Sequence, residues 1–228
     1  MTMYKKGQAP PNPRPGSYIL VVTKEGSYWR LKRGTLKKAK VNAAYTESIA
    51  RMKISAPAAS RVMRKLQPYM NGLHTGRLNA RISALFRKSL SEKGQLSLQY
   101  LNDFDFQKEY PLEQLLQEQI TATQTRHEVI VTIPVHAGTI KKLNRLITDY
   151  YFELVLLYGN VGKDQGLRTE SVESAVYAIV KDYKKPCTLR MVLPGQPWIA
   201  LLKVNSFEGH QPSVHPKLYG LKVVAAGE

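Results

Sequence analysis

The apolar and polar pattern near the start of the chain contains two short runs of residues that favour strands, "SYILVV" at 17–22 and "SYWRLKR" at 27–33. The Gly-containing turn "TKEG" separates them, and this arrangement predicts a β-hairpin. With the two-residue period of a strand, the second run has two faces, one with Tyr28, Arg30 and Lys32, the other with Trp29, Leu31 and Arg33.

The period becomes helical between residues 55 and 90. Ser55 followed by Pro57 indicates an N-cap and a first turn. The apolar face of this first helix comprises Ala58, Ala59, Val62, Met63 and Leu66. "NG" at 71–72 ends it, and a second helix is expected from about Thr75 to Leu90. Both helices carry cations away from their apolar faces: Arg61, Arg64 and Lys65 on the first, and a narrow stripe of Arg77, Arg81 and Lys88 on the second.

Beyond residue 94 the period returns to two. Residues 95–101 and 104–107 are short strand candidates, and 110–116 fits a helix or a strand equally. The remaining sequence contains seven strand-like runs separated by Gly/Pro turns: 120–124, 128–135, 150–158, 174–181, 187–193, 198–204 and 218–224. Short strands with this punctuation predict an antiparallel β-sandwich. Residues 139–149, a short helix or polar insertion, and the 159–173 loop interrupt the pattern.

These elements predict an α+β protein in three parts. Residues 1–16 form a flexible Pro-rich arm, 17–93 a basic hairpin with two helices, and 94–228 the β-sandwich. The order of the hairpin, the Arg/Leu-rich segment and "NDFDFQ" resembles a family of uncharacterised proteins from Bacteroidota. That family has a "FDFN"-like sequence before a β-rich half, whereas this chain has Gln107 in place of the Asn. The resemblance implies a non-enzymatic module and supplies no site residue.

The net charge of +17 is concentrated in one part of the chain. Residues 1–90 contain 19 Lys and Arg against two acids, Glu25 and Glu47, whereas residues 91–228 contain 15 residues of each sign. Such asymmetry indicates a negatively charged partner, which could be nucleic acid, an anionic surface or an acidic protein. A basic face that only aids solubility is the plainer alternative, but uncompensated charges repel one another.

Several classes of protein are disfavoured. Cys187 is the single cysteine, which excludes an intrachain disulfide framework and a cysteine-based zinc site. The first residues lack the apolar region of a secretory signal, and the longest apolar runs are too short to cross a bilayer. We therefore expect a cytoplasmic protein without a membrane span, with export by an unrecognised route left open.

Candidate catalytic residues are few. Asp103 and Asp105 would share one face of a strand, where paired carboxylates could bind Ca²⁺ or act as acid and base. A solvent-facing edge strand explains them more simply. His136 fits a turn histidine with its own partners, and Cys187 an inert buried thiol. We therefore expect no catalytic residue, no metal site, no cofactor and no enzymatic activity.

The strongest signal is "YWRLKRGTLKKAK" at 28–40. Cations beside aromatic residues suit single-stranded nucleic acid, with Tyr28 and Trp29 as a stacking platform. Trp29 could instead pack with Leu31, which would leave electrostatics alone. The predicted polyanion or partner-binding residues are Arg30, Lys32, Arg33, Lys37, Lys38 and Lys40 on the hairpin, and Arg61, Arg64, Lys65, Arg77, Arg81 and Lys88 on the helices.

Two functions use these residues. The first is a non-catalytic structural or assembly protein, a homo-oligomer or larger assembly, whose basic part engages an acidic partner or neighbouring subunits. The alternative is a nucleic-acid-binding protein with phosphate contacts that are largely independent of sequence. Sheet edges that could accept a strand from another copy favour the first function.

Overall fold

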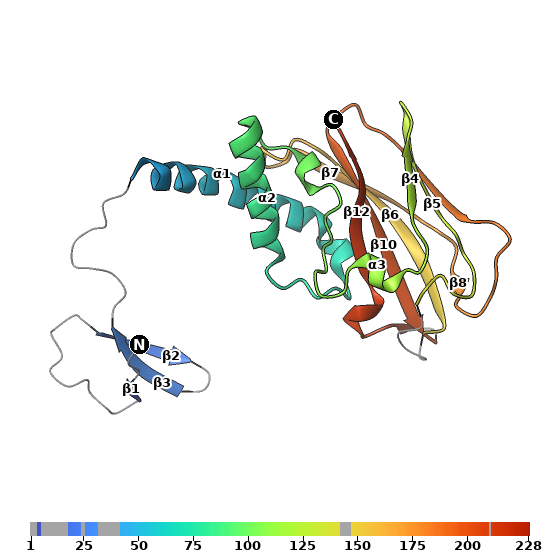
Figure 1. The fold of residues 1–228 in the computed structure, drawn as a ribbon, viewed down its shortest axis with the longest axis horizontal. Helices are drawn as coiled ribbons and strands as arrows, with labels where there is room; N and C mark the ends of the chain where they lie inside the picture. The colour runs from blue at the N-terminus through green and yellow to red at the C-terminus, as the bar shows by residue number, and fades with distance from the viewer. Residues whose placement is uncertain (1–3, 6–17, 24–25, 32–41, 142–146, 210) are drawn as a thin grey trace. The chain divides into compact units, whose positions relative to one another are not determined.

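The computed structural model describes the chain except for residues 1–3, 6–17, 24–25, 32–41, 142–146 and 210 (Figure 1). The described residues form two compact units, Met1–Thr46 and Glu47–Glu228. The helices and the C-terminal sheets therefore belong largely to one unit, a point that the sequence left open.

Unit 1 contains the predicted hairpin. Strand β2 (Tyr18–Thr23) pairs antiparallel with β3 (Gly26–Leu31), and the short β1 (Tyr4–Lys5) pairs with the other edge of β3. The side chain of Asn42 caps the helix that follows, because its Oδ1 accepts a hydrogen bond of 2.8 Å from the Tyr45 backbone N–H.

Helix α1 (Ala43–Leu66) begins twelve residues before the predicted start. Ser55 is no N-cap: it is fully buried inside the helix, 3.2 Å from the Ser83 hydroxyl, and Pro57 is accommodated in the helix interior. The 3₁₀ helix η1 (Gln67–Met70) follows, and Gly72 makes the predicted break with a φ of +81°, which favours glycine. Helix α2 spans Leu78–Lys93.

Two antiparallel sheets build the rest of unit 2 (Figure 1). The larger contains β6 (Asp149–Gly159), β7 (Leu167–Glu173), β8 (Tyr177–Ala178), β10 (Trp198–Glu208), β11 (Gln211–Pro212) and β12 (Gly220–Gly227). The smaller contains β4 (Thr121–Gln124), β5 (Glu128–Ile133) and β9 (Cys187–Val192). The predicted α+β class is confirmed.

The larger sheet is the middle of three layers, because alternate residues of its strands point to opposite faces. One face packs against the smaller sheet, with Leu202 of β10 and Val131 of β5 in a shared core. The other packs against the helices, with Leu201 of β10, Val62 of α1 and Phe86 of α2 in a second core. These two cores explain why β6 and β10 are buried almost throughout.

The linking segments differ most from the prediction. Residues 98–101 form the 3₁₀ helix η2 (Leu98–Leu101) rather than a strand, and 112–115 form the short helix α3 (Leu112–Leu115). Strand β7 lies inside the predicted 159–173 loop. The predicted 104–107 strand is reduced to one bridge that lines the edge of β12, where the Phe106 N–H donates to Leu221 O (2.9 Å) and the Val223 N–H donates to Phe104 O (3.0 Å). The 3₁₀ helix η3 (Pro216–Leu218) leads into β12.

Gln107 is fully buried, and its side chain holds three segments together. Its Oε1 accepts a hydrogen bond of 2.7 Å from the His74 N–H. Its Nε2 donates to Pro216 O at 2.8 Å and to Tyr219 O at 3.3 Å. The position where the sequence departs from the "FDFN" pattern is thus the link between the helical layer and the loop before β12.

Candidate polyanion interface

The predicted hairpin cations lie largely outside the described residues. Lys32, Arg33, Lys37, Lys38 and Lys40 all fall between 32 and 41. The backbones of Trp29 and Arg30 belong to β3, opposite Leu20 and Ile19, but their side chains are outside the described part. Tyr28 is half-buried. The stacking platform therefore stays a prediction.

The predicted helix cations separate into two groups. Arg64, Lys65 and Arg77 are exposed, and none has an ion-pair partner among the residues that the structure describes. Lys88 is also exposed, with Glu92 at 3.8 Å on the next turn. An exposed pair of this kind contributes little to stability, so Lys88 can exchange its partner at small cost.

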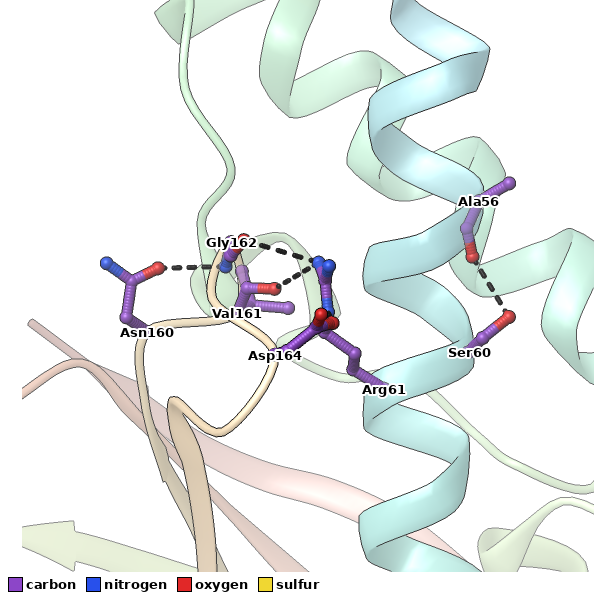
Figure 2. Close-up of polar contacts among 7 residues, drawn as sticks. All are labelled: Ala56, Ser60, Arg61, Asn160, Val161, Gly162 and Asp164. Carbon is purple, nitrogen blue, oxygen red and sulfur yellow. Dashed lines mark hydrogen bonds and ion pairs between the residues drawn. The ribbon is translucent and has the colours of Figure 1, made fainter.

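Arg61, by contrast, binds within the protein (Figure 2). Its Nε donates to the Asp164 carboxylate at 2.7 Å, and its Nη1 donates to Val161 O and Gly162 O at 3.3 Å each. These acceptors belong to the turn between β6 and β7, and Arg61 has only 17% of its side chain exposed. Arg61 therefore ties helix α1 to the sheet.

Replacing Arg61 by alanine is expected to lower the free energy of unfolding by about 1–2 kcal/mol, because the partly buried Val161 carbonyl loses a charged donor and the ion pair with Asp164 is lost. Urea denaturation of the full chain measures this change. Arg64→Ala, one turn further along the same helix, is the matched control and should stay within about 0.5 kcal/mol of wild type. Equal effects of the two substitutions would contradict the structural role of Arg61.

Arg81 is also used internally. Its Nη2 donates to Asp105 O at 2.6 Å, and its guanidinium carbon lies 4.5 Å from the centre of the Phe104 ring. Burial lowers the pKa of the Arg81 guanidinium, although the nearby Asp105 carboxylate acts in the opposite direction. The predicted stripe of Arg77, Arg81 and Lys88 thus has its central member turned toward the protein.

A hollow of about 350 Å³ between α1 and α2 gathers other cations. Arg51 of α1 faces Arg87 and Lys88 of α2 across it, and the polar lining is completed by Glu92 and the hydroxyls of Ser48 and Ser91. The Arg51 Nη1 donates to Ser91 Oγ at 2.9 Å, while its Nη2 pairs with Glu47. Three cations stand here against two carboxylates.

Such a lining suits a phosphate or carboxylate group. Arginine offers planar paired donors to both, and lysine and serine add further donors. Arg51 and Arg87 were not among the predicted site residues. The sequence did contain a signal for Arg87, since it neighbours Lys88 on the outer side of α2, but Arg51 lies before the predicted start of the first helix.

Residues considered for catalysis have structural roles. The Asp105 carboxylate accepts the backbone N–H groups of Gln107 (3.1 Å) and Leu112 (2.8 Å), and burial is the main cause that raises its pKa. Asp103 sits in a turn with a φ of 60° and pairs with Lys222 at 2.6 Å, so the predicted shared strand face is wrong. No group of three potential metal ligands occurs in the part of the chain that is described.

His136 and Cys187 match their predicted character. The His136 Nδ1 accepts the Gly138 N–H at 3.0 Å, which leaves Nε2 as the donor toward Glu118, also at 3.0 Å. Cys187 is buried in the core between the two sheets, and this burial raises the pKa of its thiol. A thiol kept protonated is a poor nucleophile.

A buried ion pair was not anticipated. Lys203 of β10 lies opposite Glu153 of β6, with 3.7 Å between Nζ and Oε2, and both side chains are more than nine-tenths buried. Desolvation lowers the pKa of Lys203, against the attraction of Glu153 and Glu173. Each strand has a single charged residue inside an apolar run, "FELVL" and "ALLKV", and this isolated charge was the available sequence signal.

Comparison of the chain with protein-family models, with curated proteins and with solved structures gives no match. The resemblance to the Bacteroidota family accordingly stays a prediction. Within the described ranges, no helix is both long enough and apolar enough to cross a membrane.

Proposed function

We propose that the protein is a non-catalytic structural or assembly protein whose basic N-terminal part engages an acidic partner or neighbouring subunits. The observation that carries this proposal is the excess of cations over carboxylates on the helices, together with the hollow where Arg51, Arg87 and Lys88 converge. Arg64, Lys65 and Arg77 are further exposed cations of the helical segment. The predicted hairpin cations Arg30, Lys32, Arg33, Lys37, Lys38 and Lys40 would supply further positive charge from unit 1.

Nucleic acid is the second candidate partner, favoured by the combination of arginine and serine donors in one small hollow. Such donors contact phosphate without reading the sequence, so affinity would fall steeply with salt. Assembly with an acidic protein surface would use the same cations but yield a particle that contains protein alone.

Size-exclusion chromatography with light scattering, recorded at 260 and 280 nm at low and high salt, tests the proposal. We expect a particle that is several times the 25.8 kDa mass of one chain and has a protein-like absorbance ratio. The double variant Arg87→Glu/Lys88→Glu should reduce the size of that particle, because it reverses two of the three charges in the hollow. A monomer that is unchanged by the variant contradicts the proposal.

Lys184→Glu/Lys185→Glu is the matched control, since these adjacent exposed lysines lie in the turn before β9, within the electrically balanced half. It should leave the particle unchanged. A monomer that carries 260 nm absorbance only at low salt would instead support the nucleic-acid candidate. Titration of a labelled oligothymidylate should then show a salt slope reduced by about 0.7 for each phosphate contact that the Arg87→Glu/Lys88→Glu variant removes.

A further inference from the structure

A second hollow, of about 740 Å³, lies on the helix-side face of the larger sheet. Its floor comes from β6, β7 and β10, and its walls from residues 68–72 after α1 and 212–219 before β12. Lys203 and Asn205 lie on the same face of β10 as Leu201, which the helices cover. The hollow therefore begins where the helical layer ends, and it is separate from the cationic hollow between α1 and α2.

Aromatic rings dominate the apolar part of the lining. Tyr151 and Phe207 stack with 5.7 Å between ring centres, and Tyr69 and Tyr219 add two further rings. Tyr219 is held in place because its hydroxyl donates to Ser213 O at 2.6 Å and Gly72 approaches its ring closely. Burial raises the pKa of Tyr151 to about 12, so its hydroxyl is a neutral donor at physiological pH.

The polar part of the lining mixes donors and acceptors. Glu153 stands between Lys203 on one neighbouring strand and Glu173 on the other, all in one cross-strand row. One row further along, Asn205 has 7% of its surface exposed, and its Nδ2 finds no acceptor among the described residues. A buried amide without its partner is costly, and a ligand that supplies an acceptor would remove that cost.

The chemistry of this lining selects among ligands. An anion would meet two carboxylates, and a cation would meet the buried Lys203. A purely apolar ligand would leave the Asn205 Nδ2 without an acceptor. A hydroxyl group both donates and accepts, so it can bond with every polar group on the floor, and the C–H face of a sugar ring can rest on the aromatic side chains.

We propose that this hollow binds a neutral sugar ring, whose hydroxyls accept from Asn205 and Lys203 and donate to Glu153 or Glu173. The proposal is independent of the polyanion interface, since the two hollows share no residue. A sugar in this position would be held by the end of the helical layer and by the loop before β12 together.

Saturation-transfer NMR on the full chain, with glucose, galactose, mannose, N-acetylglucosamine and their disaccharides as probes, tests this proposal. At least one sugar is expected to receive saturation from the protein. Asn205→Ala should weaken its binding by about tenfold, because the sugar loses one buried hydrogen bond. Asn205 is buried, so the folded state of this variant is checked by circular dichroism.

A rim substitution keeps the test decisive if Asn205→Ala does not fold. Val214→Arg places a large charged side chain at the wall of the hollow from a residue that is 81% exposed. It should abolish saturation transfer, whereas Val180→Arg, at a residue 82% exposed and outside the hollow, should not. Absence of transfer to any sugar, or transfer that survives Val214→Arg, overturns the proposal.

Discussion

Replacing Lys203 by methionine is expected to lower the free energy of unfolding by about 3–5 kcal/mol, because Glu153 would keep its charge in a buried site without its partner. The two charged groups lie 3.7 Å apart and both side chains are buried, so loss of either partner should be strongly destabilising. Urea denaturation at neutral pH, with the midpoint and the slope both fitted, measures the loss.

The double variant Lys203→Met/Glu153→Gln separates the net contribution of the ion pair to stability from the penalty of leaving one buried charge unpaired. It removes both charges and should recover most of the lost stability, because neutral side chains avoid the desolvation cost of two buried charges. Burial likewise lowers the pKa of Lys203. A double variant as unstable as Lys203→Met would mean that the packing of the lysine side chain, rather than its charge, is what the fold requires.

Gln107→Leu is expected to cost about 3 kcal/mol, because it leaves the backbone groups of His74, Pro216 and Tyr219 without their side-chain partner. Gln107→Asn should cost less but remain destabilising, since a side chain shorter by one methylene cannot span all three groups. Thermal and urea unfolding of the full chain measure both changes.

Gln114→Leu is the control for this pair, because Gln114 is exposed and its side chain makes no hydrogen bond within the described residues. It should stay within about 0.5 kcal/mol of wild type. If Gln107→Asn matched wild type, the asparagine of the "FDFN" pattern would fit this fold as well as glutamine does, and the departure at Gln107 would carry no structural meaning.

The sequence pattern predicted those helices and strands that have a clear apolar face. The alternation in β5 and β9 and the apolar stripe of α2 are strong, and these elements exist close to where they were expected. Strand β7 was missed because an edge strand with mostly exposed residues has no apolar face to detect. Residues 95–100 alternate like a strand, but residues 98–101 fold as a 3₁₀ helix whose Leu98 and Leu101 enter the helix-side core.

The predicted binding site was less accurate than the predicted elements, because its contacts join residues that are far apart in the sequence. Arg61 and Arg81 look like surface cations on a helical wheel, but their acceptors, Asp164 and Asp105, are supplied by remote segments. The hollow with Asn205 and Lys203 depends on five separate segments that meet only in the folded chain. No periodicity within one segment could have predicted either arrangement.

The position of β12 has a consequence for the order of folding. This strand closes the larger sheet beside β10, lines up with residues 104–106, and contributes Leu221 and Val223 to the core beneath α1 and α2. During synthesis the two helices emerge more than a hundred residues before it, so the core that they share with this strand stays incomplete until then. Contacts this distant in sequence slow folding, and a nascent chain of this protein would expose part of its apolar core until residues 220–227 leave the ribosome.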